Sequence, residues 1–448
     1  MTMPITDPIL EAARAAAGVT GASMAIWDGA ALTIAVAGVR NSVTGDPVTA
    51  DTVMHIGSIT KIFNAVLVMQ LVDDGLISLD DPVIEHLPEF RIRDEAARAR
   101  ITCGMLLNHT SGIDGVFLPD FGPDQERLVD ALARCADLDQ LHPPGGGPSY
   151  CNMAVVVAGC LAQKIRGKSW YTLVKERVFE PLEMRHALAD LTDLPRFRVS
   201  VGDLADPATG TIVQATRPFL PLSMAPAGAT LMMSAADLVT FGRAMVNGGV
   251  GPGGGRILSR ESAERMMRPT KAMILPADYH WGLGWMLLPG GLVHHGGGGP
   301  GVSSVFYAHP ATGRVVALLT NCDKHMALGP SLIEPLLEVW TGRSQQRPEP
   351  PALPPVDPAP YLGVYESVML RFRVVARKGG LAAAVTIKTL VYENTVTAEP
   401  PLLELKFIGN DEFKGKPGTY LERIRFAEPD ESGRMQVLAG FGYVLTRR

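Results

Sequence analysis

Cysteine is scarce in this sequence, with five residues in 448, and no two of them form a C-x-x-C pair. An odd number of cysteines without such a pair favours neither a disulfide framework nor a thiolate zinc site. We therefore expect a reducing, cytoplasmic setting for the protein.

An excess of positive charge and long hydrophobic runs are also missing. The formal net charge is -5 and no long run of lysine and arginine occurs, which argues against nucleic acid as a partner. The most apolar stretches, such as 153–162, fall short of the ~18 to 20 residues that cross a bilayer. The first residues lack both the cationic and the apolar region of a signal peptide. We expect no membrane partner.

Apolar residues, by contrast, make up 46% of the chain, which is enough for a large packed core. At 448 residues the chain is longer than a single typical domain. Seven prolines between Arg347 and Pro360 can neither continue a helix nor donate to a sheet. The sequence therefore predicts a catalytic domain at 1–346, a linker at 347–360 and a smaller domain at 361–448.

The catalytic region is predicted to have strands at both ends and helices between them. Two β-prone runs, 22–27 and 32–39, flank the turn signal Asp28-Gly29 and predict a hairpin. The stretch 56–73 is apolar nearly all round, as in a helix inside a protein. Further helices are expected near 102–108, 125–137, 152–166, 170–178 and 235–247, strands at 284–288, 303–309 and 315–320, and a last helix at 331–340. This order indicates an α+β fold in which one antiparallel sheet is assembled from distant segments.

Short strands separated by turn residues are predicted in the C-terminal region, at 361–366, 370–377, 381–387, 402–407, 424–426 and 435–445. A small antiparallel β-barrel is the fold expected there. The glycine runs 253–255 and 296–299 lack the spacing of phosphate-binding loops and are interpreted as backbone turns.

A candidate nucleophile lies where the apolar helix begins. Ser58 falls in its first turn and Lys61 three residues on, so that the two side chains share one face. A serine hydroxyl needs a nearby base, and a helix N-terminus favours the negative charge that develops during attack. The S-x-x-K pattern alone also fits an N-cap serine followed by a solvated lysine.

Two further short motifs contain reactive side chains. Tyr150-Cys151-Asn152 follows a loop of proline and glycine that would present Tyr150 where a helix starts. His295-Gly296-Gly297 lies between two predicted strands. Each of these motifs alone is as consistent with a structural role as with a catalytic one.

Taken together, the three motifs resemble those of the serine β-lactamase and penicillin-binding protein family, of the peptidase S12 type. Residues 58–61 match its S-x-x-K, 150–152 its Y-x-N and 295–297 the H-x-G form of its third motif, in the family's order and approximate spacing. Other segments similar to family signatures are Leu106 to Ile113, Pro144-Gly145, Ala225 to Gly228, Trp281 to Trp285 and Pro300-Gly301. The resemblance spans roughly residues 7–340 and implies an antiparallel sheet flanked by helices beside an all-helical lobe. The C-terminal region is similar to the lipocalin-like barrels that follow some esterase and aminopeptidase members.

This resemblance implies that Ser58 forms an acyl-enzyme while Lys61 and Tyr150 move the proton as one coupled unit. Either of the two could be the base, because a cationic lysine favours the phenolate and burial favours the neutral amine. The residues that the resemblance assigns to substrate binding or to the oxyanion are Asn152, His295, Gly297 and Gly298. It implies no cofactor and no metal.

His295 stands where many β-lactamases carry lysine. A largely neutral histidine holds a substrate carboxylate less firmly than a fixed cation does. Together with the missing export signal, this favours an esterase or a small amide or peptide hydrolase over a β-lactamase or D-alanyl-D-alanine carboxypeptidase. The expected partner is a small ester, amide or short peptide, and a homo-oligomer is left open.

Other classes of function are weighed against this one. A hydrolase with a nucleophile elbow needs G-x-S-x-G, which frames no serine in this chain. His294 and His295 are adjacent and would diverge in a strand, which argues against a metal hydrolase. A non-catalytic homologue that keeps the fold as a binding module is a further alternative. For the C-terminal domain we hypothesise that it borders the catalytic cleft or makes a subunit contact, the alternative being a passive appendage.

Overall fold

The computed structural model describes most of the chain. The described residues are 5–115, 128–206, 211–275, 278–323, 328–345, 350, 353–377, 380–388, 400–417, 419–440 and 442–448. Much of the predicted linker and the first residues of the helix expected at 125–137 therefore lie outside the described residues.

The helices and strands that were predicted occur in the predicted order, whereas α3, α4, α10, β3 to β9 and β11 were not predicted. The α-helices are α1 (Asp7–Ala17), α2 (Thr60–Asp73), α3 (Val83–His86), α4 (Glu95–Arg98), α5 (Cys103–Leu107), α6 (Leu128–Arg134), α7 (Asn152–Arg166), α8 (Trp170–Val174), α9 (Ala235–Val246), α10 (Arg260–Met266) and α11 (Glu334–Thr341), with the 3-10 turn η1 (Gly57–Ile59) before α2. The strands of the catalytic region are β1 (Gly21–Trp27), β2 (Leu32–Gly38), β3 (Met54–His55), β4 (Ala187–Leu188), β5 (Asp203–Ala205), β6 (Ile212–Gln214), β7 (Met232–Met233), β8 (Lys271–Ala272), β9 (His280–Trp281), β10 (Met286–Leu288), β11 (Leu292–Gly299), β12 (Val302–His309) and β13 (Arg314–Thr320).

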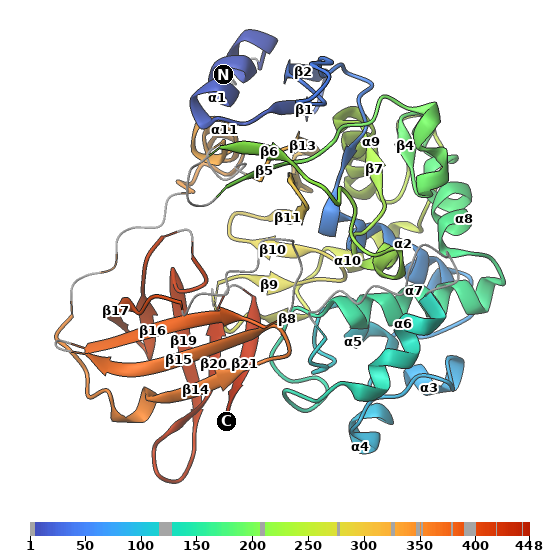
Figure 1. The fold of residues 1–448 in the computed structure, drawn as a ribbon. Helices are drawn as coiled ribbons and strands as arrows, with labels where there is room; N and C mark the ends of the chain where they lie inside the picture. The colour runs from blue at the N-terminus through green and yellow to red at the C-terminus, as the bar shows by residue number, and fades with distance from the viewer. Residues whose placement is uncertain are drawn as a thin grey trace.

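A central antiparallel sheet joins the two ends of the catalytic region (Figure 1). Its eight strands run in the order β2-β1-β13-β12-β11-β10-β9-β8. β1 pairs with β13 so that Ala22 lies opposite Thr320 and Trp27 opposite Val315. The predicted N-terminal hairpin is confirmed as β1 and β2. The α+β fold expected from the sequence is also confirmed.

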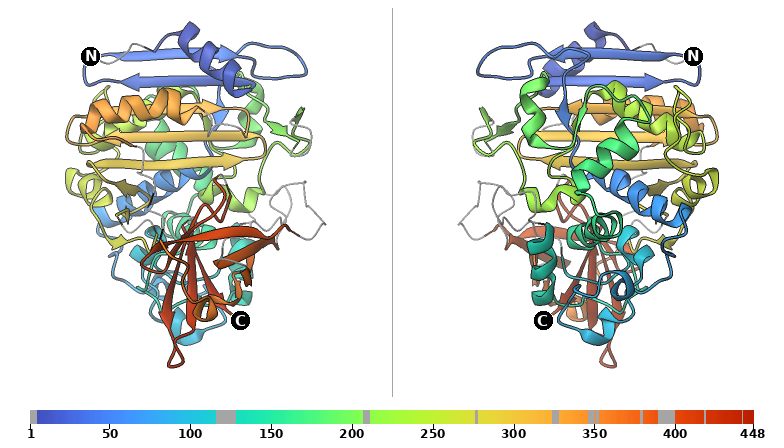
Figure 2. Two further views of the ribbon diagram at one scale, coloured as in Figure 1. Left: turned by 90° about the vertical axis from the view of Figure 1, so that its left-hand side faces the viewer. Right: turned by 90° about the vertical axis from the view of Figure 1, so that its right-hand side faces the viewer.

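Both faces of this sheet are covered. In β13, Val315, Ala317 and Leu319 join the large core that contains α2 and α9, whereas Val316 and Leu318 join a smaller core with α1 and α11. Figure 2 shows α11, in orange, lying along one face of the sheet. Because successive side chains of a strand point to opposite faces, a sheet covered on both sides needs unbroken apolar strands such as this one.

The helix α2 runs through the interior, between the sheet and the helical lobe formed by α3 to α7. Every residue from Thr60 to Leu71 is buried. Asn64 donates to the carbonyl of Val155 at 3.0 Å and accepts from the indole N–H of Trp170 at 2.8 Å. Buried polar groups need such partners, and these bonds fix α2 against α7 and α8. The prediction of an interior helix at 56–73 is confirmed.

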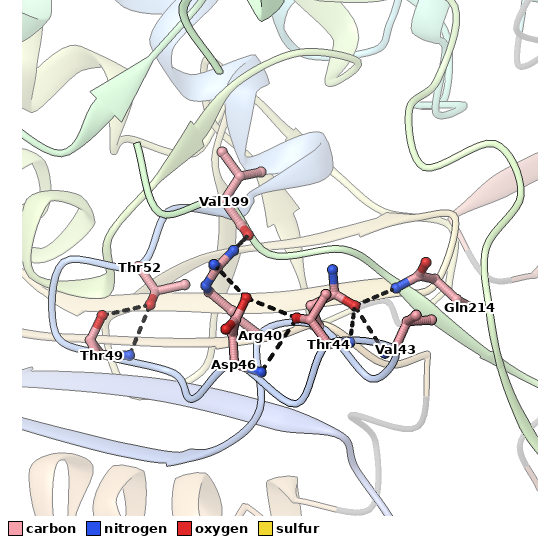
Figure 3. Close-up of polar contacts among 9 residues, drawn as sticks. Arg40, Val43, Thr44, Asp46, Thr49, Thr52, Val199 and Gln214 are labelled. Carbon is pink, nitrogen blue, oxygen red and sulfur yellow. Dashed lines mark hydrogen bonds and ion pairs between the residues drawn. The ribbon is translucent and has the colours of Figure 1, made fainter. Parts of the chain in front are cut away.

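A polar network holds the chain between β2 and β3, just ahead of η1 (Figure 3). Arg40 donates to the carbonyl of Val199 at 2.8 Å and forms an ion pair of 2.7 Å with Asp46. Val53 then donates its N–H to the carbonyl of Arg198 at 2.9 Å. These contacts fix where the chain enters the interior at η1.

The strand β11 approaches η1 backbone to backbone. A Cβ on Gly297 would lie 1.9 Å from the carbonyl oxygen of Ile56, and a Cβ on Gly57 would lie 2.5 Å from Gly298 N. Ser304 Oγ donates to the same Ile56 carbonyl at 2.9 Å. The prediction that 296–299 is a turn is therefore wrong, because this run completes β11 and pairs with β12. Strand glycines are found where another backbone comes this close.

The C-terminal region forms a closed antiparallel barrel, as predicted. Its strands are β14 (Gly363–Glu366), β15 (Leu370–Arg377), β16 (Gly380–Ile387), β17 (Leu403–Gly409), β18 (Glu412–Lys414), β19 (Arg423–Pro429), β20 (Met435–Gly440) and β21 (Tyr443–Arg447). The single strand predicted at 435–445 is wrong, since a turn at Gly442, with φ +80°, divides it into β20 and β21. β18 was not predicted.

The barrel lies beside the β8 and β9 edge of the sheet and the helical lobe (Figures 1 and 2). Among the described residues, no helix combines the length and the apolar character that crossing a bilayer requires.

Gly297→Ala should lower the free energy of unfolding by about 1 to 3 kcal/mol, because the new methyl group meets a backbone carbonyl that cannot rotate away. Gly298→Ala is the matched control, since a Cβ there meets nothing within 4 Å. Urea unfolding of the two variants measures the difference. Equal midpoints would contradict the close approach of β11 to η1.

Candidate active site

Ser58 lies in η1, at the start of the buried helix α2, and its side chain is partly exposed. Lys61 Nζ lies 3.0 Å from Ser58 Oγ, and it also donates a hydrogen bond to the carbonyl of Ala227. The structure thus brings the serine and lysine of the first motif together on one face of the helix.

The amine of Lys61 is almost completely buried, with 2% of the residue exposed. Burial lowers the pKa of Lys61 well below its usual value, an effect that the nearby Cys151 opposes without cancelling. Nζ also lies 4.8 Å from the centroid of the Tyr150 ring. Since removing an ammonium from water disfavours the charged form, burial favours the neutral amine, which is the form that can accept a proton.

Tyr150 is presented by a backbone that His109 braces on both sides. Ser149 donates its N–H to the carbonyl of His109 at 2.9 Å, and Cys151 donates its N–H to His109 Nδ1 at 3.2 Å. The rings of His109 and Tyr150 lie 4.6 Å apart. His109 has a positive φ of 61°, which is uncommon for a residue with a side chain. In this conformation, the carbonyl and the ring of His109 accept hydrogen bonds from the residues before and after Tyr150.

Other rings surround Tyr150. The ring centroids of Tyr443, Trp281 and His295 lie 5.9, 6.1 and 6.3 Å from that of Tyr150. Tyr443 belongs to the barrel, so the site is built from the helical lobe, the sheet and the barrel. Such contacts leave the phenol few orientations.

Asn152 lies at the first position of α7, two residues after Tyr150, and is buried. The N-terminus of this helix is held by Met153, which donates its N–H to the carbonyl of Gly115 at 2.9 Å. The Y-x-N motif thus coincides with the start of a helix, as the sequence predicted.

His295 faces the site, whereas His294 turns away. Nδ1 of His295 lies 2.6 Å from the carbonyl of Gly296, and Nε2 has no partner among the described residues. Burial, with the nearby Lys61 as a smaller cause, lowers the pKa of His295 to about 3. The His294 ring stacks on Tyr307 at 4.0 Å instead. His295 is therefore neutral at physiological pH, and the adjacent histidines are not placed to share a metal.

Gly298 N lies next to the Gly57-Ser58 peptide. A Cβ on Gly57 would lie 2.5 Å from Gly298 N, and one on Gly228 would lie 2.9 Å from Ser58 N. The two backbone nitrogens assigned to the oxyanion are thus close to one another. Gly297 provides this approach because it has no side chain.

The described residues include one group that could hold a metal ion, Asp81, Glu85 and His86 around α3. His86 Nε2 lies 2.7 Å from a carboxylate oxygen of Asp81. None of these residues belongs to the cluster around Ser58.

Three residues at this site were not singled out from the sequence. His109 and Trp281 fall within segments noted only as signatures, at 106–113 and 281–285, so a signal for them existed. Tyr443 lies far along the chain in another domain, and no local pattern marks it.

Comparison with known proteins identifies the family of the chain. A family model described as Beta-lactamase matches residues 6–338. The chain is 35% identical over 366 residues to Penicillin-binding protein 4 of Amycolatopsis lactamdurans, a match that covers 80% of this chain and 95% of that protein.

Three solved structures, of two proteins, are similar over long stretches. The crystal structure of SurE matches with a TM-score of 0.77 and 26% identity, covering 99% of this chain and 98% of that one, and a second SurE structure, with D-Leu, has a TM-score of 0.74. The D-amino acid amidase of Ochrobactrum anthropi SV3 matches with a TM-score of 0.58 and 27% identity, covering 70% of this chain and 89% of that one. The resemblance inferred from the three motifs is confirmed, and the chain belongs to the beta-lactamase family, a family of hydrolases that share this fold.

Proposed function

We propose that the protein is a serine hydrolase that forms an acyl-enzyme on Ser58, and that it cleaves small esters, amides or short peptides. One observation carries the proposal: a buried lysine amine, depressed in pKa, lies 3.0 Å from the partly exposed Ser58 hydroxyl. This pair supplies the nucleophile and the nearby base that covalent catalysis by serine requires.

In the proposed reaction, Ser58 Oγ attacks the substrate carbonyl while its proton passes to the neutral Lys61 amine. The leaving oxygen or nitrogen takes a proton from the Tyr150 phenol, which Lys61 restores. Water then attacks the acyl-enzyme, the same groups carry its proton back to Ser58 Oγ, and the carboxylic acid is released. Lys61 and Tyr150 act as one coupled pair throughout.

Backbone and polar groups complete this proposed site. The N–H groups of Ser58 and Gly298 stabilise the oxyanion, a contribution typically worth ~3 to 4 kcal/mol for each donor. Asn152 orients Lys61 or the substrate amide, and Nε2 of His295 accepts a hydrogen bond from the substrate. Ser58 lies in η1, Gly298 and His295 lie in β11, which packs against η1, and Asn152 lies in α7, which packs against α2.

For the substrate, we propose an amino-acid ester, amide or short peptide in which the residue that supplies the scissile carbonyl has the D configuration. Two relatives support this choice, since one is a D-amino acid amidase and another has been crystallised with D-Leu. The neutral His295 favours such a substrate over a β-lactam, because it offers no fixed cation to the β-lactam carboxylate.

A second candidate is a β-lactamase or D-alanyl-D-alanine carboxypeptidase. It is favoured by the 35% identity to a penicillin-binding protein. The lack of a cation at position 295 weighs against it. A non-catalytic homologue is less favoured, because a binding module has no need for a buried lysine amine beside a serine hydroxyl.

Ser58→Ala should lower hydrolysis of a p-nitrophenyl ester by about four orders of magnitude or more, since no hydroxyl remains to be acylated. Lys61→Met should cost ~100- to 10,000-fold through loss of the base. Steady-state kinetics and labelling by a fluorophosphonate probe measure both effects. The exposed Lys168→Met is the control, and probe labelling of Ser58→Ala to the wild-type extent would contradict the assignment.

The rate of acylation should rise with pH to a plateau well below pH 10. The reason is that the pKa of Lys61 is lowered, so its reactive neutral form persists to lower pH than in a free lysine. Protonation as the pH falls then removes the base and the rate. The measurement is the probe-labelling rate between pH 5 and pH 10.

His295→Gln serves as the control for this profile. With its pKa lowered to about 3, His295 does not titrate in this range, so its loss should lower the rate without moving the acidic limb. The role of Lys61 would be contradicted if His295→Gln moved the acidic limb of the pH–rate profile. It would also be contradicted if the wild-type labelling rate kept rising up to pH 10.

D-leucine p-nitroanilide should be cleaved at least about tenfold faster than the L form, which corresponds to ~1.4 kcal/mol of discrimination. Nitrocefin should be a poor substrate. Parallel assays with one preparation measure all three, and rapid nitrocefin turnover with negligible ester cleavage would favour the β-lactamase instead.

A further inference from the structure

The turn between the barrel strands β20 and β21 reaches the catalytic region at Tyr150. The N–H of Tyr150 donates to the carbonyl of Gly442 at 2.9 Å. The N–H of Val444 donates to Ser149 Oγ at 3.1 Å. Two hydrogen bonds thus join this turn and the start of β21 to Ser149 and Tyr150, which belong to the loop before α7 that we call the tyrosine loop.

The Tyr443 side chain adds a third contact. Its ring meets the Tyr150 ring edge to face, with centroids 5.9 Å apart and an angle of 83° between the planes. A Cβ on Gly442 would lie 3.9 Å from Met273 Cε, so the turn also adjoins the segment that follows β8. The barrel therefore lies against the site itself.

The backbone N–H groups of Ser149, Tyr150 and Cys151 are held by two different parts of the molecule. Those of Ser149 and Cys151 donate to the carbonyl and to Nδ1 of His109, within the catalytic region. The one between them, on Tyr150, donates to Gly442 of the barrel. The tyrosine backbone therefore has all three of these hydrogen bonds only when the barrel is docked.

A separate contact fixes the barrel to the helical lobe. Val368, between β14 and β15, donates its N–H to a carboxylate oxygen of Asp114 at 2.7 Å. Asp114 is buried and directly precedes Gly115, whose carbonyl accepts the N–H of Met153 in α7. The barrel thus contacts both the tyrosine loop and the residue before the one that holds the start of α7.

We propose that Tyr443 is a positioning residue of the active site, and that the turn carrying it must be docked against Tyr150 for Ser58 to be acylated. This inference rests on the proposed acyl-enzyme mechanism and assigns the barrel a part in it. The ring restricts the Tyr150 phenol from the barrel side while Gly442 holds its backbone. A 1 Å displacement of a catalytic group can cost about a hundredfold in rate.

The experiment uses the full-length chain with Tyr443→Ala, Tyr443→Leu and Tyr443→Phe. A fluorophosphonate probe, which phosphonylates Ser58 with loss of fluoride, gives the maximal labelling rate and its half-saturating concentration between pH 5 and pH 10. Tyr443→Ala should lower the maximal rate about 10- to 100-fold and shift the acidic limb, with the half-saturating concentration changed less. Tyr443→Phe keeps the ring and should restore most of the rate.

Phe407→Ala is the matched control, because Phe407 is also partly buried and packs against the same barrel core. It should leave the maximal rate and the pH profile near those of the wild type. Thermal melts separate loss of folding from loss of positioning, and Tyr443→Leu preserves apolar bulk if the alanine variant does not fold.

Wild-type rate and an unmoved acidic limb in folded Tyr443→Ala or Tyr443→Leu would overturn the proposal and make the turn a passive wall. An equal loss in Phe407→Ala would overturn it as well, since the effect would then be one of barrel stability. If Ser58 of the wild type is not labelled, the proposed acyl-enzyme mechanism fails. If Ser58 is labelled at the same rate in the wild type and in the Tyr443 variants, only the role of Tyr443 fails.

Discussion

The burial of one lysine amine beside a serine hydroxyl is the interaction on which the rest of the structure depends. An ammonium ion removed from water costs several kcal/mol, whereas a neutral amine costs much less. The pKa of Lys61 is lowered because α2 is surrounded along its length by the sheet and the helical lobe. The hydrogen bonds of Asn64 to Val155 and Trp170 satisfy the polar groups that this burial would otherwise leave unpaired.

A second constraint is the approach of backbones without side chains between them. Gly57, Gly228 and Gly297 lie where a Cβ would collide with main-chain atoms within 3 Å. Three segments far apart in the sequence meet there, and the groups proposed to bind the oxyanion are backbone groups. The tyrosine loop joins this assembly through side-chain and backbone contacts from two domains, with His109 on one side and Gly442 on the other.

Local patterns predicted much of this architecture correctly. The limits of α7 at 152–166 and of β15 at 370–377 agree with the sequence predictions, because each segment has a clear periodicity and a clear boundary signal. The glycine run at 296–299 was misread because its strand conformation depends on η1, which lies more than two hundred residues earlier. The division of 435–445 was missed because the β-prone residues continue through the turn.

The sequence by itself determined the fold class, the barrel, the three motifs and the serine, lysine and tyrosine that they contain. These depend on residue type and on spacing within a few turns of chain. Only the tertiary structure decided that the lysine is buried, that burial lowers the pKa of His295 in the third motif and of the adjacent His294, and that His109, Trp281 and Tyr443 enclose the tyrosine. Burial and ring packing are properties of neighbours brought together in space, and the order of residues along one segment does not contain them.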